Sequence, residues 1–374
     1  MANRRGNSAL EMHVRAVQNR AMTKPDPQDV LESILAAAKK AGADAADALL
    51  LQSVSAHVAY RLGKLEEVER AESADLGLRV FVGQRIAFIS SSDFSADALA
   101  ALAPRAVAMA KLAPEDKYAC LAPPDRLARE FPALDLEDTQ EPAAEVLIAR
   151  ARDAEGAALA VKGVTNSEGG GANFDRTRIA FATSEGFRGG YAGTQHGVGV
   201  AVLAGEGTEM QVDHDSASAR HSSDLEGAEA VGRRAGKRAV ARLRPRKIKS
   251  QRVPVVYDPR AANGLLGHFA GAISGSAIAR GVSFLKDRLD KKVFAPGIRI
   301  VDDPHRLRGL RSKPFDAEGV ANRRRALIED GMLTTWLLDC ASARQLGLQT
   351  TGHAARGTGG PPSPSATNLY LEPG

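Results

Sequence analysis

The stretch ADLGLRVFVGQRIAFISSSD, residues 74–93, decides the fold class, because it is the clearest β-hairpin in the chain. Apolar side chains alternate with other residues over 76–82, Gly83 and Gln84 supply a turn, and a second apolar run covers 86–89. Alternation with a period of two is typical of a strand with one buried face, and a two-residue loop joins antiparallel neighbours. The hairpin therefore predicts an antiparallel sheet in the N-terminal half.

Segments with helical periodicity flank this hairpin and recur further along the chain. They cover residues 26–42, 95–113, 143–163 and 224–243. Asp26 and Pro27 open the first helix and Gly42 ends it, whereas Pro104 is expected to kink or break the second. Strand patterns with glycine-rich turns fill residues 47–73 and 164–219, so this half is predicted to be an α+β domain with mostly antiparallel sheet.

The domain organisation follows from these patterns and from the length. A chain of 374 residues is long for a single hydrophobic core, so two domains are expected. The N-terminal α+β domain is predicted to span residues 26–245, after a frayed or disordered tail at residues 1–25. A connector rich in proline and acidic residues lies within it at about 113–142, and its composition predicts a loop.

The second domain is expected over residues 250–374 as a glycine-rich, mainly antiparallel and barrel-like β domain. Its segment RVPVVYDP, residues 252–259, predicts a short strand, and a hairpin is expected around Asp330 and Gly331. The sequence finishes at Gly374 on a strand and a turn with no closing element. We therefore expect this domain to be truncated.

Composition narrows the class of protein. Hydrophobic residues make up 44% and charged residues 25% of the chain, values that are ordinary for a soluble globular protein. The two cysteines, Cys120 and Cys340, lie far apart and form no disulfide framework, which favours a reducing compartment. No apolar run approaches the roughly 18 residues of a membrane span, and the N-terminus lacks the apolar core of a secretory signal. A cytoplasmic protein without membrane contact is expected.

A basic run at residues 233–252 concentrates the positive charge, with ten Lys or Arg and no acidic residue. Such a run could contact phosphates as part of a nucleic-acid interface. It could also be a solvated helix end followed by a basic linker. The absence of interleaved aromatic residues and of a DNA-binding motif favours the second interpretation, so a nucleic-acid partner is not expected.

The segment NGLLGHFAGAISGSAIARG, residues 263–281, is the only long helix candidate in the second half, and it holds one histidine and no carboxylate. Glycines recur along it at spacings of three and four, which places them on one face of a helix. They are Gly264, Gly267, Gly271 and Gly275. This face either admits the backbone of another chain or packs inside the domain, and the sequence leaves both open.

Two acidic pairs and one histidine are further candidates for a cleft. Paired carboxylates such as Asp302 with Asp303 and Asp316 with Glu318 can act as acid and base or bind a hard cation. Their proline and glycine neighbours favour a structural role, in which the side chains bond nearby backbone amides. His353 lies near Arg356 in a glycine-rich loop and could face a cleft, although a lone loop histidine is more often on the surface.

Several blocks together resemble one known family. They are residues 65–93 (LEEVERAESADLGLRVFVGQRIAFISSSD), 183–194 (TSEGFRGGYAGT), 254–304 around GLLGHFAGA, 313–339 (KPFDAEGVANRRRALIEDGMLTTWLLD) and 342–357 (SARQLGLQTTGHAARG). In this order they resemble the TldD/PmbA family, also called modulators of DNA gyrase, and specifically its PmbA (TldE) branch. The resemblance runs from about residue 30 to the end of the chain.

The resemblance implies a cytoplasmic protease system in which TldD-type and PmbA-type chains associate and act on small or unfolded peptides. It also implies that the TldD branch holds zinc with a His-Glu-x-x-x-His helix and a cysteine near the C-terminus. At the matching positions this chain has Gly267, His268 and Ala272. A catalytic zinc needs about three protein ligands, an open position for water and a carboxylate base, which this set does not supply.

The sequence therefore predicts a PmbA/TldE-type subunit with vestigial metal-site positions and no metal or cofactor of its own. Zinc is expected in a TldD-type partner, and self-association as a dimer is the other assembly considered. Two alternatives remain. The chain could be an active metallopeptidase with atypical ligands, His268 with Asp302 or Asp303, or a gyrase-associated regulator that binds DNA through residues 233–252.

Overall fold

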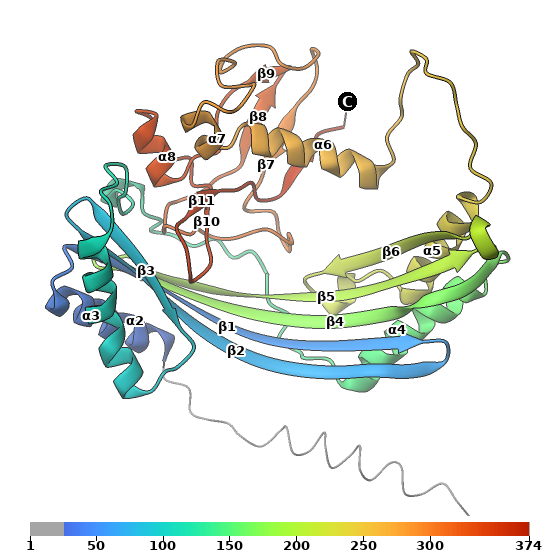
Figure 1. Ribbon diagram of the computed structural model, residues 1–374, viewed down its shortest axis with the longest axis horizontal. Helices are drawn as coiled ribbons and strands as arrows, with labels where there is room; N and C mark the ends of the chain where they lie inside the picture. Colours follow the sequence, from blue (N-terminus) through green and yellow to red (C-terminus); the bar gives the residue numbers. More distant parts are fainter. Residues whose placement is uncertain (1–25, 374) are drawn as a thin grey trace, which may run out of the picture.

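The computed structural model describes residues 26–373, so the predicted tail at 1–25 lies outside the described residues. Its largest feature is an antiparallel sheet of six strands in the order β3-β2-β1-β4-β5-β6. Figure 1 shows that this sheet is long and strongly curled, like half of a barrel. The strands are β1 (Ala45–Arg61), β2 (Lys64–Val82), β3 (Arg85–Ser91), β4 (Val164–Thr183), β5 (Arg188–Ala204) and β6 (Gln211–Ala219).

The hairpin predicted at residues 74–93 is confirmed as the β2–β3 pair. Val82 pairs with Arg85 and Phe81 with Ile86, so the loop is Gly83 and Gln84 as the sequence indicated. Gly83 has a φ of 58°, a left-handed conformation that glycine adopts without steric cost. The sequence did not show that β2 continues back to Lys64 and forms an even longer hairpin with β1.

Four helices cover one face of the sheet, at the positions where the sequence predicts them. They are α2 (Pro27–Ala41), α3 (Ala96–Leu112), α4 (Ala144–Leu159) and α5 (Ala228–Ala241). Asp26 caps α2 by accepting a hydrogen bond from the Gln28 amide, and Gly42 ends it in the left-handed conformation. α3 continues through Pro104, which is exposed, so the carbonyl that lacks an N–H partner can be hydrated.

Strand alternation explains which residues face the helices. On β1, Ala46, Ala48 and Leu50 pack with α2 and α3, whereas Leu49 belongs to a separate cluster on the other face. Val58 has the same parity and packs against α4. Successive side chains in a strand point to opposite faces, so one face carries all four helices. The opposite face is the inner, concave side of the curl (Figure 1).

The second half of the chain forms a smaller region that lies against this concave face (Figure 1). Its strands form one sheet in the order β12-β7-β8-β9 and a separate β10-β11 pair. The elements are α6 (Pro259–Ala272), α7 (Gly275–Ala279), β7 (Ile300–Asp302), β8 (Arg325–Glu329), β9 (Met332–Leu333), α8 (Cys340–Gln345), β10 (Ala354–Ala355), β11 (Ser363–Pro364) and β12 (Leu369–Leu371).

The predicted α+β class with antiparallel sheet is confirmed, and the curled half-barrel is formed by the six-stranded sheet. The hairpin around Asp330 and Gly331 is also confirmed, as the β8–β9 pair. The strand predicted at 252–259 is wrong, because residues 251–258 belong to no helix or strand and are exposed, and Pro259 already begins α6. Its apolar alternation is that of a strand, but no strand within residues 26–373 pairs with it.

The predicted helix at 263–281 is two helices. α6 ends at Ala272 and α7 begins after Ser274, because the chain there turns to form a bridge between Ser274 and Leu337. Residues 113–142, predicted as a connector loop, contain one 3-10 turn, η1 (Pro124–Arg126), and isolated β-bridges at Glu115 and Leu127. No helix among residues 26–373 is long and apolar enough to cross a membrane.

Candidate functional site

The α6 helix carries the positions that match the family's metal-binding helix. Asp258 caps it by accepting a hydrogen bond from the Arg260 amide, and Phe269 is its only buried residue. His268 and Gly267 are exposed to solvent. A Cβ added at Gly267 would meet no atom within 4 Å, so this part of the helix has no close neighbour in the described structure.

The glycine face of the two helices is therefore not uniform. Gly264 and Gly271 are as open as Gly267, whereas a Cβ on Gly275 in α7 would lie 2.9 Å from the carbonyl oxygen of Leu337. Only Gly275 is required by close packing inside the domain. The three glycines of α6 leave backbone accessible at the surface.

The residues on α6 do not fit a catalytic zinc ion. Gly267 and Ala272 have no donor atoms, and a single imidazole at 268 supplies one ligand of about three that such a site needs. Within residues 26–373, no group of three or more His, Cys, Asp or Glu side chains is arranged to hold a metal ion. In the alternative set, His268 is exposed on α6, whereas Asp302 is fully buried and bonded to His353 and Thr367.

The predicted acidic residues bond backbone amides, as the sequence indicated for turn residues. Asp303 Oδ1 accepts from the amide of His305 at 3.0 Å. Asp316 accepts from the amides of Glu318 and Val320 at 2.9 Å and from that of Ala354 at 3.0 Å. These bonds fix the loops of the C-terminal region and leave no open carboxylate pair.

His353 is buried, so the expectation of a surface position is wrong. Its Nε2 lies 3.2 Å from Asp302 Oδ2, and its Nδ1 lies 2.8 Å from the hydroxyl of Thr351. Thr367 also donates to Asp302 through its amide and hydroxyl, each at 2.6 Å. Burial alone would raise the pKa of Asp302, but the bonds from His353 and Thr367 outweigh it and hold that pKa below its usual value.

This hydroxyl–imidazole–carboxylate chain has the order of a catalytic triad without access for a substrate. Thr351 is 7% exposed, His353 2% and Asp302 0%. The Thr351 hydroxyl also accepts a hydrogen bond from the amide of Leu338 at 2.8 Å. All three side chains are therefore committed to holding the C-terminal loops together.

Arg356 belongs to a buried ion cluster at the junction of the two regions. Its Nη1 lies 2.7 Å from Asp47 Oδ1 on β1, and Arg79 Nε on β2 donates to Asp47 Oδ2 at 2.8 Å. Arg79 Nη2 lies 3.8 Å from Glu318 Oε1, which has no hydrogen-bond partner. Burial raises the pKa of Glu318 to about 7, against the effect of Arg79. The cluster joins the sheet to the C-terminal loops.

An open cleft lies next to this cluster, between the concave face of β4 and β5 and the C-terminal region, and is here called the junction cleft. It has a volume of about 350 Å³. None of the six predicted cleft residues lines it. Its walls are Asp175, Thr177, Ile179, Tyr191, Gly193, Thr194, Gln195 and Arg220 from the sheet side, and Leu310, Arg311, Ser312, Lys313, Ala355, Ser365, Ala366 and Thr367 from the C-terminal side.

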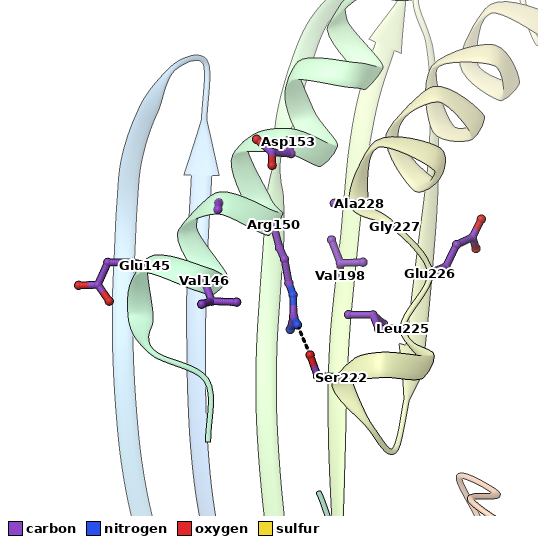
Figure 2. Close-up of a pocket in the computed structure, with 11 residues that line it drawn as sticks. Glu145, Val146, Arg150, Asp153, Val198, Ser222, Leu225, Glu226, Gly227 and Ala228 are labelled. Atoms are coloured by element: carbon purple, nitrogen blue, oxygen red, sulfur yellow. Dashed lines mark hydrogen bonds between the residues drawn. The ribbon is translucent and has the colours of Figure 1, made fainter. Parts of the chain in front are cut away.

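A second pocket, of about 490 Å³, lies on the helix-covered face between α4 and the start of α5. Figure 2 shows Arg150 in its middle, where Nη2 donates to the Ser222 hydroxyl at 2.6 Å. Glu145, Asp153 and Glu226 also line it, so acidic groups outnumber the one arginine. It contains no predicted site residue and lies away from the C-terminal region, so we regard the junction cleft as the better candidate site.

The basic run divides into a paired half and an exposed half. On α5, Arg234 Nε lies 2.5 Å from Asp215 of β6 and Arg238 pairs with the same carboxylate, and Arg242, just after the helix, lies 3.5 Å from Asp213. Residues 245–252 are exposed and irregular. This is the predicted helix end with a basic linker, and intramolecular acids neutralise much of its helical part.

The sequence of this chain is similar to those of a known protein family. The chain matches the models of three domains: PmbA/TldA metallopeptidase domain 1 at residues 46–110, the central domain at 137–243 and the C-terminal domain at 250–374. It is 39% identical over 312 residues to the metalloprotease PmbA of Escherichia coli O157:H7, covering 83% of this chain and 69% of that protein. It is 33% identical over 343 residues to a PmbA homologue of Haemophilus influenzae, covering 91% and 76%.

Solved structures agree with the fold. A modulator of DNA gyrase from Bacteroides thetaiotaomicron superposes with a TM-score of 0.86 at 23% identity, covering 94% of this chain and 78% of that one. TldE from Thermococcus kodakarensis gives a TM-score of 0.76 at 18% identity, covering 92% and 77%. The domains are those of a metallopeptidase family. This chain belongs to the PmbA/TldD family, within its PmbA/TldE group.

Proposed function

We propose that this chain is the subunit of a TldD/PmbA-type proteolytic complex that handles small or unfolded peptides without a metal centre of its own. In this proposal a TldD-type partner supplies the zinc, and the present chain positions the peptide. The observation that carries it is the chemistry of α6, where Gly267 and Ala272 offer no donor atoms and His268 stands exposed without a carboxylate base.

The concave face of the sheet supports a role in holding extended peptide. Beyond the C-terminal region it bears a groove of about 390 Å³ whose floor is rich in glycine and small polar residues. Its lining includes Gly171, Asn173, Gly197, Gly199, Ser216 and Ser218, with His57 and His214. Small side chains leave strand backbone and polar atoms within reach of an extended chain, which suits unfolded peptides better than a folded surface.

Relatives named as metalloproteases support the proteolytic setting, and the TldE neighbour supports a TldD-type partner. The test combines this chain with a TldD-type subunit and follows cleavage of an unstructured peptide by mass spectrometry. Activity in the mixture that exceeds that of the partner alone, with no cleavage by this chain alone, is the expected result.

A matched variant tests whether α6 holds a metal ion or whether this chain only positions the peptide. His268 is the only candidate ligand on α6, and its side chain is exposed. Cleavage by the mixture should therefore be unchanged in His268→Ala. Cleavage by this chain alone that is lost both on chelation and in His268→Ala would overturn the proposal, because it would place a working metal site here.

A further inference from the structure

We propose that the junction cleft binds a compact oxyanion, and that the C-terminal carboxylate of a peptide is the group it holds. The choice of a peptide rests on the proposed function, whereas the preference for an anion rests on the cleft itself. Its volume of about 350 Å³ lies in the range of small-ligand sites, about 300–1,000 Å³.

Three cationic residues line this cleft without forming a salt bridge. They are Arg220, Arg311 and Lys313, and none forms a salt bridge with any residue that the structure describes. Some arginines of the same region are paired, as Arg308 is with Asp135 at 2.6 Å and with Asp224 at 2.9 Å. Others, such as Arg306, also lack a salt bridge within residues 26–373, and the cleft differs because three unpaired cationic residues line it together.

Arg220 is held rigidly by backbone carbonyls. Its Nε donates to Gly309 at 3.2 Å, Nη1 to Thr194 at 3.0 Å and Nη2 to Leu310 at 2.6 Å. A guanidinium has five N–H donors, so two remain for a ligand. Burial lowers the pKa of Arg220, as expected for a cation without an anionic partner. Its orientation is set by the junction between the two regions before any ligand arrives.

Lys313 contributes from the opposite wall. Its ammonium donates to the carbonyl of Ala354 at 2.9 Å, which leaves two of its three N–H groups without a partner. The nearest acids are already engaged, since Asp316 accepts three backbone amides and Asp302 is bonded to His353 and Thr367. Burial lowers the pKa of Lys313 although Asp316 and Asp302 oppose this effect, and an anion in the cleft would offset the remaining cost.

The rest of the lining offers the third cation, Arg311, together with neutral donors and one acid. Arg311 is exposed, with Nη2 3.3 Å from the Ser365 hydroxyl. Burial raises the pKa of Tyr191 to about 12, so its phenol stays protonated and can donate. Asp175 is the one carboxylate in the lining, and it accepts a hydrogen bond from the Asn173 amide group at 2.6 Å. The cleft keeps a net positive charge with Asp175 included.

Binding to the isolated chain tests this inference without any need for proteolysis. Calorimetric titration compares an acetylated tri-alanine peptide ending in a free carboxylate with the same peptide ending in a carboxamide, and inorganic phosphate is titrated separately. A charge-assisted hydrogen bond stabilises by enough to change affinity about tenfold or more, so the carboxamide should bind at least that much more weakly.

Three variants locate the binding. Arg311→Gln, at an exposed position that does not threaten folding, and Lys313→Met should each abolish the preference for the free carboxylate. Arg306→Gln removes the same charge from an exposed arginine that does not line the cleft, and should leave the preference intact.

The outcomes separate this inference from the proposed function. Equal binding of the two peptides, or a preference that survives both Arg311→Gln and Lys313→Met, would overturn the carboxylate site and leave the subunit role to the cleavage assay. Phosphate binding without peptide binding would overturn the peptide assignment. Binding of neither would overturn the oxyanion site altogether.

Discussion

The buried ion cluster allows a prediction whose size follows from the structure. Asp47 is fully buried and is the carboxylate shared by Arg79 and Arg356, whose side chains are 6% and 2% exposed. Asp47→Asn keeps the shape of the side chain and removes its charge, which leaves two buried guanidinium groups facing a neutral amide. Breaking one side of a buried ion pair costs about 3–5 kcal/mol, because the remaining charge stays desolvated.

Urea unfolding followed by tryptophan fluorescence measures this cost. Trp336, the only tryptophan, is buried in the core of the C-terminal region that the cluster anchors. With an m value of about 3 kcal/mol/M, the unfolding midpoint should fall by about 1 M or more. The matched control is Arg233→Gln, which breaks an exposed pair with Glu229 on α5 and should cost no more than about 0.5 kcal/mol. A loss below about 1 kcal/mol in Asp47→Asn would refute the claim that this cluster holds the junction.

Three further changes test the junction and the loops around it. Burial raises the pKa of Glu318 to about 7 in the folded chain, so between about pH 4.5 and 7 the folded state binds a proton that the unfolded state has lost. The free energy of unfolding should therefore fall as pH rises through this range. Glu318→Gln should remove this fall in urea titrations at several pH values. His353→Ala should cost about 1–3 kcal/mol in thermal unfolding, since it leaves its buried carboxylate without that donor, and a neutral effect would contradict this. Gly275→Ala should cost about 1–3 kcal/mol from overlap with Leu337, whereas Gly267→Ala, in open space, should be neutral or stabilising by about 0.5–1 kcal/mol.

Local patterns in the sequence predicted most of the elements. The hairpin at residues 74–93 and the first helix with its caps were visible because alternation, turn residues and capping residues lie close together in the chain. The strand expected at 252–259 failed for a physical reason. A strand needs a partner for its backbone, and local sequence cannot show whether a partner is present.

The candidate site was harder to predict because it is assembled across the chain. The partners of Asp47 come from positions 79 and 356, and Arg220 and Lys313, far apart in the sequence, line the same cleft. One signal was available: Arg79 lies between apolar residues in the hairpin, on the face opposite to Leu78 and Val80. A charged residue that is flanked by apolar residues in a strand indicates a buried partner of opposite charge on the same face of the sheet.

We propose that this chain has no metal centre of its own, and zinc binding to the purified chain tests this proposal most directly. The chain is equilibrated with zinc, separated from free metal by gel filtration and analysed by mass spectrometry for metal per chain, beside His268→Ala. We expect zinc far below stoichiometric amounts and no difference between the two proteins. Stoichiometric zinc in the parent chain that is lost in His268→Ala would contradict the claim.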